Sequence, residues 1–335
     1  MSHEITMTAG KSEMAYQGEK PWHGLGQQLE AGATIEQWTE AAGMQWKIQR
    51  SKVRYFADRE GTQQMEWPAQ NVLFRSDTKA PLGLVSPKFK VVQPQEVLEF
   101  FRDLVDDSGF TLETAGTLFG GRRFWALANI GESAIIANAA DLVGGYLLLC
   151  TAADGTLATT ARFTTVRVVC NNTLSMSLNG KSKQETTLSH RSKFDAGRFK
   201  DELGIAHGSF GSFIKEMRHL AEVPLRHEGA DLLTKKLLAP AGLDTEDIMM
   251  MDEASEKLQA SKGYQNIMGL FEGAGSGAKM LGVKDTAWGW LNAVTEHVDH
   301  HARAMSLDKR LDSAWFGKGD TMKTRAIELA HELLG

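Results

Sequence analysis

The chain has 335 residues, of which 42% are hydrophobic and 24% charged, a balance that excludes an intrinsically disordered protein. Its formal net charge of −5 is mildly acidic, which neither requires nor excludes a nucleic-acid partner. No stretch approaches the roughly 18 apolar residues of a membrane-spanning helix, and the first residues lack a secretory signal pattern, so we expect a cytoplasmic protein without a membrane partner.

The first 190 residues alternate between strand-like and helix-like patterns. The opening to about residue 32 is loop-like and contains the sequence PWHGLG at 21–26, which is typical of an anchored turn. Thr34 suits the N-cap of a helix that ends at Gly43, and Gly120-Gly121 suit the turn of a hairpin. In chain order the predicted elements are a helix over 34–42, strands over 46–56, 70–75 and 81–85, a helix over 95–105, and hairpins over 110–130 and 145–169.

The chain beyond residue 190 is predicted to be mainly helical. The expected helices cover 194–203, 210–222, 230–238, 252–267, 287–304 and 322–334. A glycine-rich segment over 272–282 is predicted to be a loop. The sequence therefore predicts the α+β class, with an antiparallel-sheet domain and packed helices over 1–190 and a helical region over 191–335.

Positive charge is concentrated in one part of the chain. Between Arg162 and Lys200 there are eight basic and two acidic residues, so this segment carries +6 in a chain whose net charge is −5. The remaining residues must then carry −11. Such an asymmetry favours a polyanionic partner for the basic segment.

Basic and aromatic residues also lie side by side in three places of the strand-rich half. These residues are Arg50, Lys52, Arg54 and Tyr55; Lys88, Phe89 and Lys90; and Arg122, Arg123 and Trp125. Cations neutralise phosphates, and flat rings stack on bases without regard to sequence, so this combination suits a single-stranded nucleic acid. A sheet with one buried and one solvated face gives the same alternation and is the structural alternative.

The segment ARFTTVRVVCNNTLSMSL, at 161–178, combines a β-branched strand with a polar corner. We interpret its side chains, with the basic residues that follow, as contacts to a phosphate backbone. The residues concerned are Arg162, Arg167, Asn171, Asn172, Lys181, Lys183 and Arg191. A purely structural turn, in which the asparagines adopt left-handed conformations or cap the next element, explains the corner equally well.

Other patterns do not predict a catalytic, cofactor or metal site. The GAGSGAK sequence at 273–279 lacks the Gly-Lys-Ser/Thr order of a phosphate-binding loop. His297, His300 and His301 share a helix face, but no glutamate follows the first histidine as zinc proteases require. Cys150 and Cys170 each lie in an apolar strand-like segment, which favours buried free thiols. We therefore expect no catalytic residue, no cofactor and no metal.

Four separated sequences resemble one family. They are PWHGLG, FTTVRVVCNNTL, SHRSKF and TAWGWLNAVTEHVDHHAR, and they occur in this order along nearly the whole chain. The set resembles the phage/plasmid-like family of the nine-three-two domain of unknown function. This resemblance implies a mobile genetic element in a bacterial host cell and a role in genome maintenance, recombination or counter-defence. The predicted order of helices and hairpins is also similar to that of annealing proteins of the Rad fifty-two and phage recombinase type, which is an analogy of fold alone.

The sequence thus favours a non-enzymatic protein that binds single-stranded DNA and anneals complementary strands in recombination. The basic residues would contact phosphates, and Tyr55, Phe89 and Trp125 would stack on bases. Annealing requires several subunits to hold many nucleotides, so we expect a homo-oligomer. The first alternative is a protein-interaction or counter-defence module that acts on a host factor. The second is an enzyme acting on nucleic acid, with a metal held by His297, His300 and Asp299.

Overall fold

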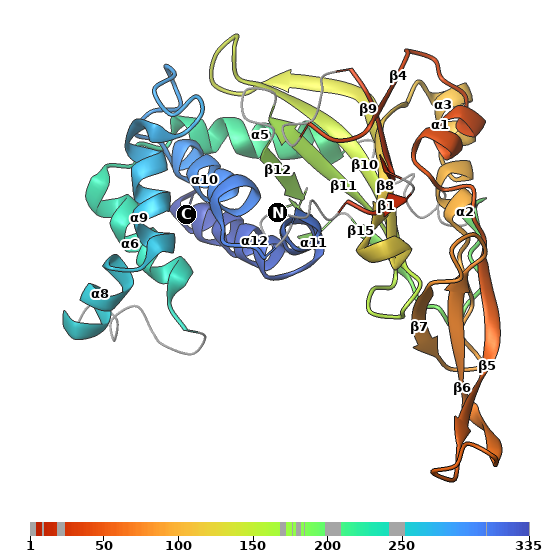
Figure 1. Cartoon of the computed structure of the whole chain (residues 1–335). Helices are drawn as coiled ribbons and strands as arrows, with labels where there is room; N and C mark the ends of the chain where they lie inside the picture. Colours follow the sequence, from red (N-terminus) through yellow and green to blue (C-terminus); the bar gives the residue numbers. More distant parts are fainter. Residues whose placement is uncertain are drawn as a thin grey trace. The chain divides into compact units, whose positions relative to one another are not determined.

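A computed structural model of the chain describes residues 5–8, 10–18, 24–167, 172–175, 177–178, 182–183, 185–197, 209–240, 252–305 and 307–334 (Figure 1). The chain forms two compact units. The first comprises residues 1–131, 146–162 and 185–205, and the second comprises 132–145, 163–184 and 206–335. These units are interleaved along the sequence, whereas the predicted division places a single boundary near residue 190. Strands β9 (Arg123–Ile135), β10 (Leu142–Ala152) and β11 (Thr159–Arg167) each have residues in both units.

The first unit is built on a sheet that includes the beginnings of β9 and β11 and the end of β10. Its other strands are β3 (Met14–Gln17), β4 (Gln27–Leu29), β8 (Thr111–Leu118) and β15 (Glu185–Leu188). The order runs β11-β10-β9-β8-β3-β4, and β15 pairs with β11. The β3–β8, β8–β9 and β11–β15 pairs are antiparallel, whereas β3 and β4 are parallel. The predicted hairpin at Gly120-Gly121 is confirmed as β8 and β9, joined by the turn η1 (Phe119–Gly121).

The opening segment contains short strands where a loop was predicted: β1 (Met7–Thr8) and β2 (Lys11–Ser12) pair with each other, and β3 and β4 join the sheet. Helix α1 (Ile35–Ala41) confirms the predicted cap, because the Thr34 hydroxyl accepts from the backbone N–H of Gln37. The helix predicted over 95–105 is instead two helices, α2 (Pro94–Glu99) and α3 (Arg102–Ser108). Phe100 and Phe101 lie between them and are both fully buried. Consecutive side chains of one helix point in different directions, so burying both rings favours a break here.

A separate antiparallel sheet, also in the first unit, contains β5 (Ile48–Phe56), β6 (Gln64–Arg75) and β7 (Pro81–Val85) in that order. Strand β7 pairs only with residues 71–74 of β6. Residues 53–67, which we call the arm, therefore form a two-stranded ribbon beyond the third strand, and the ribbon extends away from the rest of its unit (Figure 1). An irregularity in the β5–β6 pairing separates the arm from the base of the sheet.

The second unit is mainly helical, and the α+β class is confirmed. Its helices are α5 (Ser209–Glu222), α6 (His227–Leu238), α8 (Asp252–Gln259), α9 (Lys262–Gly269), α10 (Ala287–Glu296), α11 (Leu307–Phe316) and α12 (Lys318–His331). The shorter elements are the π-helical turns η3 (Leu270–Ala274) and η4 (His297–His301), the 3-10 turn η5 (Glu332–Leu334), and strands β12 (Asn172–Ser175), β13 (Ser177–Leu178) and β14 (Ser182–Lys183).

Helix α10 is buried along its whole length and forms the centre of the second unit (Figure 1). Its indole N–H groups find partners within this unit: Trp288 donates to the Asp141 carboxylate at 2.9 Å, and Trp290 donates to the Thr234 hydroxyl at 2.9 Å. The helix predicted over 252–267 is interrupted at Ser261, which caps α9. Most of the helix predicted over 194–203 lies outside the described residues. None of the helices in the described ranges is long and apolar enough to cross a bilayer.

Candidate nucleic-acid interface

Arg50 connects the base of β5 to a loop that follows β7. Its Nη2 donates to the carbonyl oxygen of Phe89 at 2.6 Å, and its Nη1 donates to that of Pro87 at 3.3 Å. The loop side chains Lys88 and Lys90 are exposed. The β5 side chains Arg50, Lys52 and Arg54 are exposed as well. Two basic clusters that are separated in sequence are therefore held next to each other.

The same loop is joined to residues 190–191. The rings of Phe89 and His190 are stacked, with centroids 4.3 Å apart and planes inclined by 20°. The backbone N–H of Lys90 also donates to the carbonyl of His190 at 2.6 Å. The exposed side chain of Arg191 follows directly in the chain. Because Phe89 is buried against His190, it cannot stack on a base, and the prediction that it does so is corrected.

Further contacts connect His190 to the turn between β10 and β11, and that turn to the start of β9. A ring nitrogen of His190 lies 2.9 Å from the carbonyl oxygen of Leu157. In the same turn, the Thr156 hydroxyl accepts from Nη2 of Arg123 at 3.0 Å. Arg123 is partly buried, and burial lowers its pKa. Its neighbour Arg122 is exposed.

We call the exposed cations on these connected segments the junction surface. They are Arg50, Lys52, Arg54, Lys88, Lys90, Arg122 and Arg191. The contacts through Phe89 and His190 bring together segments that lie up to about 140 residues apart in the chain. All of the residues in this set belong to the first unit.

The carboxylate of Glu66 lies beside two of these cations. Glu66 accepts from Lys52 at 2.8 Å and from Arg54 at 3.2 Å, across the β5–β6 pair. The hydrogen bond from Lys52 is the main cause of the lowered pKa of Glu66. All of these side chains are exposed, so water weakens the two ion pairs. With one carboxylate against two cations, the group of Lys52, Arg54 and Glu66 keeps a positive charge.

Two other predicted contact residues lie in the interior. Trp125 is only 2% exposed, and its indole N–H lies 3.4 Å from the Thr114 hydroxyl. Arg162 is also buried and lies opposite Glu185 in the β11–β15 pair. Neither side chain can reach a nucleic acid while the sheet is intact, so both are corrected to structural residues. The β9 and β11 segments that carry them have both faces covered, which defeats the expected alternation of buried and solvated positions.

The remaining predicted contacts belong to the second unit. Asn171 and Lys181 lie outside the described residues. Arg167 and Asn172 are register partners across β11 and β12, and Lys183 pairs with Ser177 in β14 and β13. The structure describes only the backbone of these three residues, so their phosphate contacts stay a prediction.

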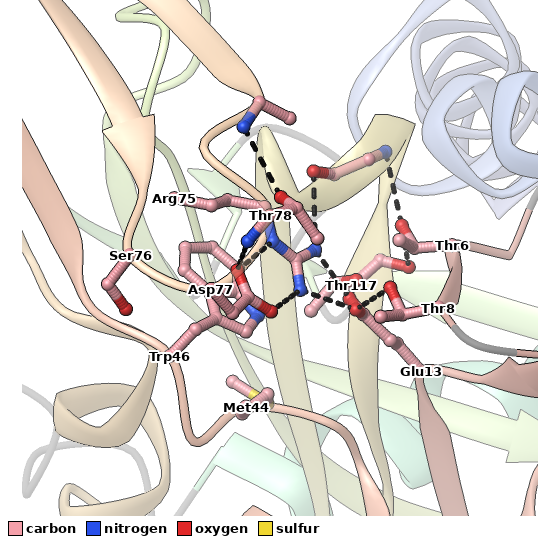
Figure 2. Close-up of polar contacts among 12 residues, drawn as sticks. Thr6, Thr8, Glu13, Met44, Trp46, Arg75, Ser76, Asp77, Thr78 and Thr117 are labelled. Carbon is pink, nitrogen blue, oxygen red and sulfur yellow. Dashed lines mark hydrogen bonds and ion pairs between the residues drawn. The ribbon is translucent and has the colours of Figure 1, made fainter.

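The sequence did not reveal a buried ion pair between Arg75 and Glu13. Figure 2 shows the guanidinium between the carboxylates of Glu13 and Asp77, next to the ring of Trp46. Arg75 Nη2 lies 2.6 Å from Glu13 Oε1, and Nη1 lies 3.0 Å from Oε2. The Trp46 ring centroid is 4.2 Å from the guanidinium carbon. Burial acts to lower the pKa of Arg75, but hydrogen bonds to Asp77 and Glu13 outweigh it and raise the pKa.

This cluster forms part of the wall of a pocket of about 650 Å³ in the first unit. Each of the five N–H groups of the guanidinium has an acceptor, on Glu13, Asp77 or the Gly120 carbonyl. Glu13 accepts in addition from Thr8 at 2.6 Å and from Thr117 at 2.5 Å. No donor of Arg75 remains for a ligand, so the cluster stabilises the packing of β6 against Glu13, β8 and η1.

A second buried ion pair occupies the helical unit. Lys323 Nζ donates to Asp299 Oδ1 at 2.9 Å and to the carbonyl and hydroxyl of Thr173 at 2.8 and 2.9 Å. The other oxygen of Asp299 accepts from the backbone N–H of Thr173 at 2.7 Å. Asp299 is thus held by Lys323 and Thr173. Among the described residues, no group of three or more His, Cys, Asp and Glu side chains is placed to hold a metal ion.

Burial also shifts the pKa of Cys150 and that of His297. Cys150 is a buried free thiol, as predicted, and burial raises its pKa to about 12. Burial also lowers the pKa of His297 to about 4, with a further contribution from the charge of His301. Both shifts have a structural cause and neither group belongs to the junction surface. Cys170 lies outside the described residues.

These features define an α+β protein of two interleaved units, with a cationic junction surface on the first. The family model described as Domain of unknown function (DUF932) matches residues 81–315. The match covers well over half of the chain, so the protein belongs to this family, as its sequence motifs predicted. No curated protein and no solved structure matches the chain.

Proposed function

We propose that this protein binds single-stranded DNA through the junction surface and anneals complementary strands in recombination. The observation that carries the proposal is the Phe89–His190 stack, with the backbone contacts around it. These contacts hold the segments of Arg50, Lys88 and Arg191 together. Cations that are scattered in the sequence thereby occur on connected segments, as a polyanion requires.

The expected energetics are those of counterion release. Each phosphate that a lysine or arginine neutralises releases a counterion bound to the DNA, so affinity falls as salt rises. If about six phosphates are neutralised, the logarithm of the affinity falls with the logarithm of salt concentration at a slope of roughly −4 for a single strand. A slope of this size distinguishes binding by several cations of the junction surface from one adventitious contact.

In this proposal the protein is not an enzyme, is encoded by a phage or plasmid, and acts in the cytoplasm of the bacterial host as a homo-oligomer. Annealing of aligned and screened strands is energetically downhill and needs no nucleotide or metal. Two buried ion pairs, Arg75–Glu13 and Lys323–Asp299, support a structural role for these residues, because their polar groups hydrogen-bond within the protein.

The test is a fluorescence-anisotropy titration of the purified full-length protein against labelled single- and double-stranded oligonucleotides, at two salt concentrations. The mass of the complex is measured in parallel. The proposal predicts tighter binding of the single strand, weakening with salt as above, and a mass of several subunits. Absence of binding, or an affinity independent of salt, would overturn it.

A further inference from the structure

We infer that one face of the arm is a stacking platform for unpaired bases, so that the arm gives the protein its preference for single strands. This inference rests on the proposed function, because it concerns the same DNA. It goes beyond the proposed function in assigning strand preference to one face of the arm, and above all to Trp67, which the sequence analysis did not single out.

The β5–β6 register divides the arm into two faces. Tyr55 is the partner of Met65, and Val53 is the partner of Trp67. Side chains of directly opposed residues lie on the same face of a sheet, and alternate residues of a strand share that face. These four side chains therefore form one apolar face. Lys52 and Arg54, at the alternate positions of β5, project from the other face.

The apolar face is open to solvent. Tyr55 is 51% exposed, Met65 42% and Trp67 47%, although each carries a large apolar side chain. Three large apolar side chains exposed together on one face of the arm mark a candidate binding site.

The positive charges on β5 favour nucleic acid over a second copy of the chain as the ligand of the arm. Strand β5 is an edge of its sheet, so its free backbone is the natural place for a second β5 to pair. An antiparallel pairing centred on Lys52 would set Lys52 against its own copy and Arg50 against Arg54. Like charges directly opposite each other are destabilising, whereas a phosphate backbone matches all of them.

Geometry also suits consecutive bases. Tyr55 and Trp67 are diagonal neighbours across the two strands, which places their side chains about 7–8 Å apart. Both rings can then take one base each. Lys52 and Arg54 project from the other face, so they contact phosphates only where the strand passes around the β5 edge. A duplex keeps its bases stacked inside the helix and cannot use this face without being opened.

The test compares Tyr55→Ala and Trp67→Ala with the wild-type protein, in titrations against single- and double-stranded oligonucleotides. Loss of each ring should weaken single-strand binding about tenfold and leave duplex binding unchanged. Trp67→Phe keeps a flat ring and should restore most of the single-strand affinity. Leu281→Ala, at an apolar residue 87% exposed in the second unit, is the matched control and should change neither affinity.

The outcomes separate this inference from the proposed function. If the wild-type protein binds and the ring variants bind both substrates as tightly as it does, the stacking platform is wrong and the junction surface stands. If the ring variants lose single-strand and duplex binding together and their mass falls to a monomer, the face is a subunit contact and the inference is overturned. If the wild-type protein binds no DNA, both fail. Circular dichroism and thermal melting confirm that each variant is folded.

Discussion

Arg50 donates from its Nη2 to the backbone carbonyl oxygen of Phe89 across 2.6 Å. The bond joins a cation of the β5 strand to the loop that carries Lys88 and Lys90. Since Phe89 is stacked on His190, the same loop also fixes the position of Arg191. The function of Phe89 in this account is to organise the cationic segments and not to bind a base.

Removing the loop cations should weaken DNA binding without affecting the fold. Lys88 and Lys90 are exposed, so Lys88→Ala/Lys90→Ala should leave the free energy of unfolding within about 0.5 kcal/mol of wild type. If each contacts one phosphate, the salt slope for a single strand should become less steep by about 1.4. Salt-dependent anisotropy titrations measure this slope. An unchanged slope would place the phosphate contacts elsewhere.

Neutralising Glu66 should have the opposite effect on binding. Its carboxylate competes with phosphates for Lys52 and Arg54, so Glu66→Gln should raise the affinity for a single strand several-fold at low salt. The gain should shrink as salt screens the interaction. Because the two ion pairs are exposed, unfolding by urea should change by less than about 1 kcal/mol. A fall in affinity would show that Glu66 positions the cations instead of neutralising them.

The buried ion pair of Arg75 should dominate the stability of the first unit. Glu13→Gln removes one charge and leaves the guanidinium buried, with only Asp77 as a charged partner, so we expect a loss of about 3 kcal/mol in the free energy of unfolding. Glu66→Gln is the matched control for an exposed ion pair. Equal stabilities of the two variants in urea unfolding would contradict the assignment of the Figure 2 cluster as a structural element.

His297 should make stability depend on pH. Its pKa is about 4 in the folded protein, against 6.5 for the free side chain, so the unfolded chain binds the proton more readily between these values. The contribution to stability is complete above pH 6.5 and is lost as pH falls toward 4. Between pH 7.5 and pH 5 the expected loss is at most about 2 kcal/mol. Glutamine at position 297 cannot titrate, so His297→Gln should lose less stability than the wild type between the two pH values. Urea unfolding at each pH measures this difference. An identical loss in both proteins would assign the effect to other groups.

Local features of the fold could be predicted because their causes are local. Thr34 caps α1 through a residue three positions away, and Gly120-Gly121 supply the left-handed backbone that the β8–β9 turn needs. Breaks in helices were missed at Phe100-Phe101 and Ser261. In each case the helical period continues through the break, and tertiary burial or a competing cap determines the boundary.

The candidate nucleic-acid interface was harder to predict, because it depends on contacts between residues that are far apart in the sequence. Trp67 and Trp125 both stand beside charged residues in strands, yet Trp125 is in the core and Trp67 is half exposed. The difference comes from what covers each strand. Pro68, directly after Trp67, was the available signal, since proline in a strand is confined to edges and bulges. Phe89 stacks on His190, about 100 residues away, and no sequence pattern predicts this contact.

The most direct measurement compares two charge-reversal variants of identical net charge. One is Lys52→Glu/Lys88→Glu/Lys90→Glu on the junction surface, and the other is Lys262→Glu/Lys279→Glu/Lys284→Glu, at exposed lysines of the second unit. Both are titrated against a labelled single-stranded oligonucleotide at the same salt concentration. We expect the junction variant to lose binding by about a hundredfold or more and the second-unit variant to stay close to wild type. Equal losses in the two variants would show that overall charge, and not the junction surface, governs binding.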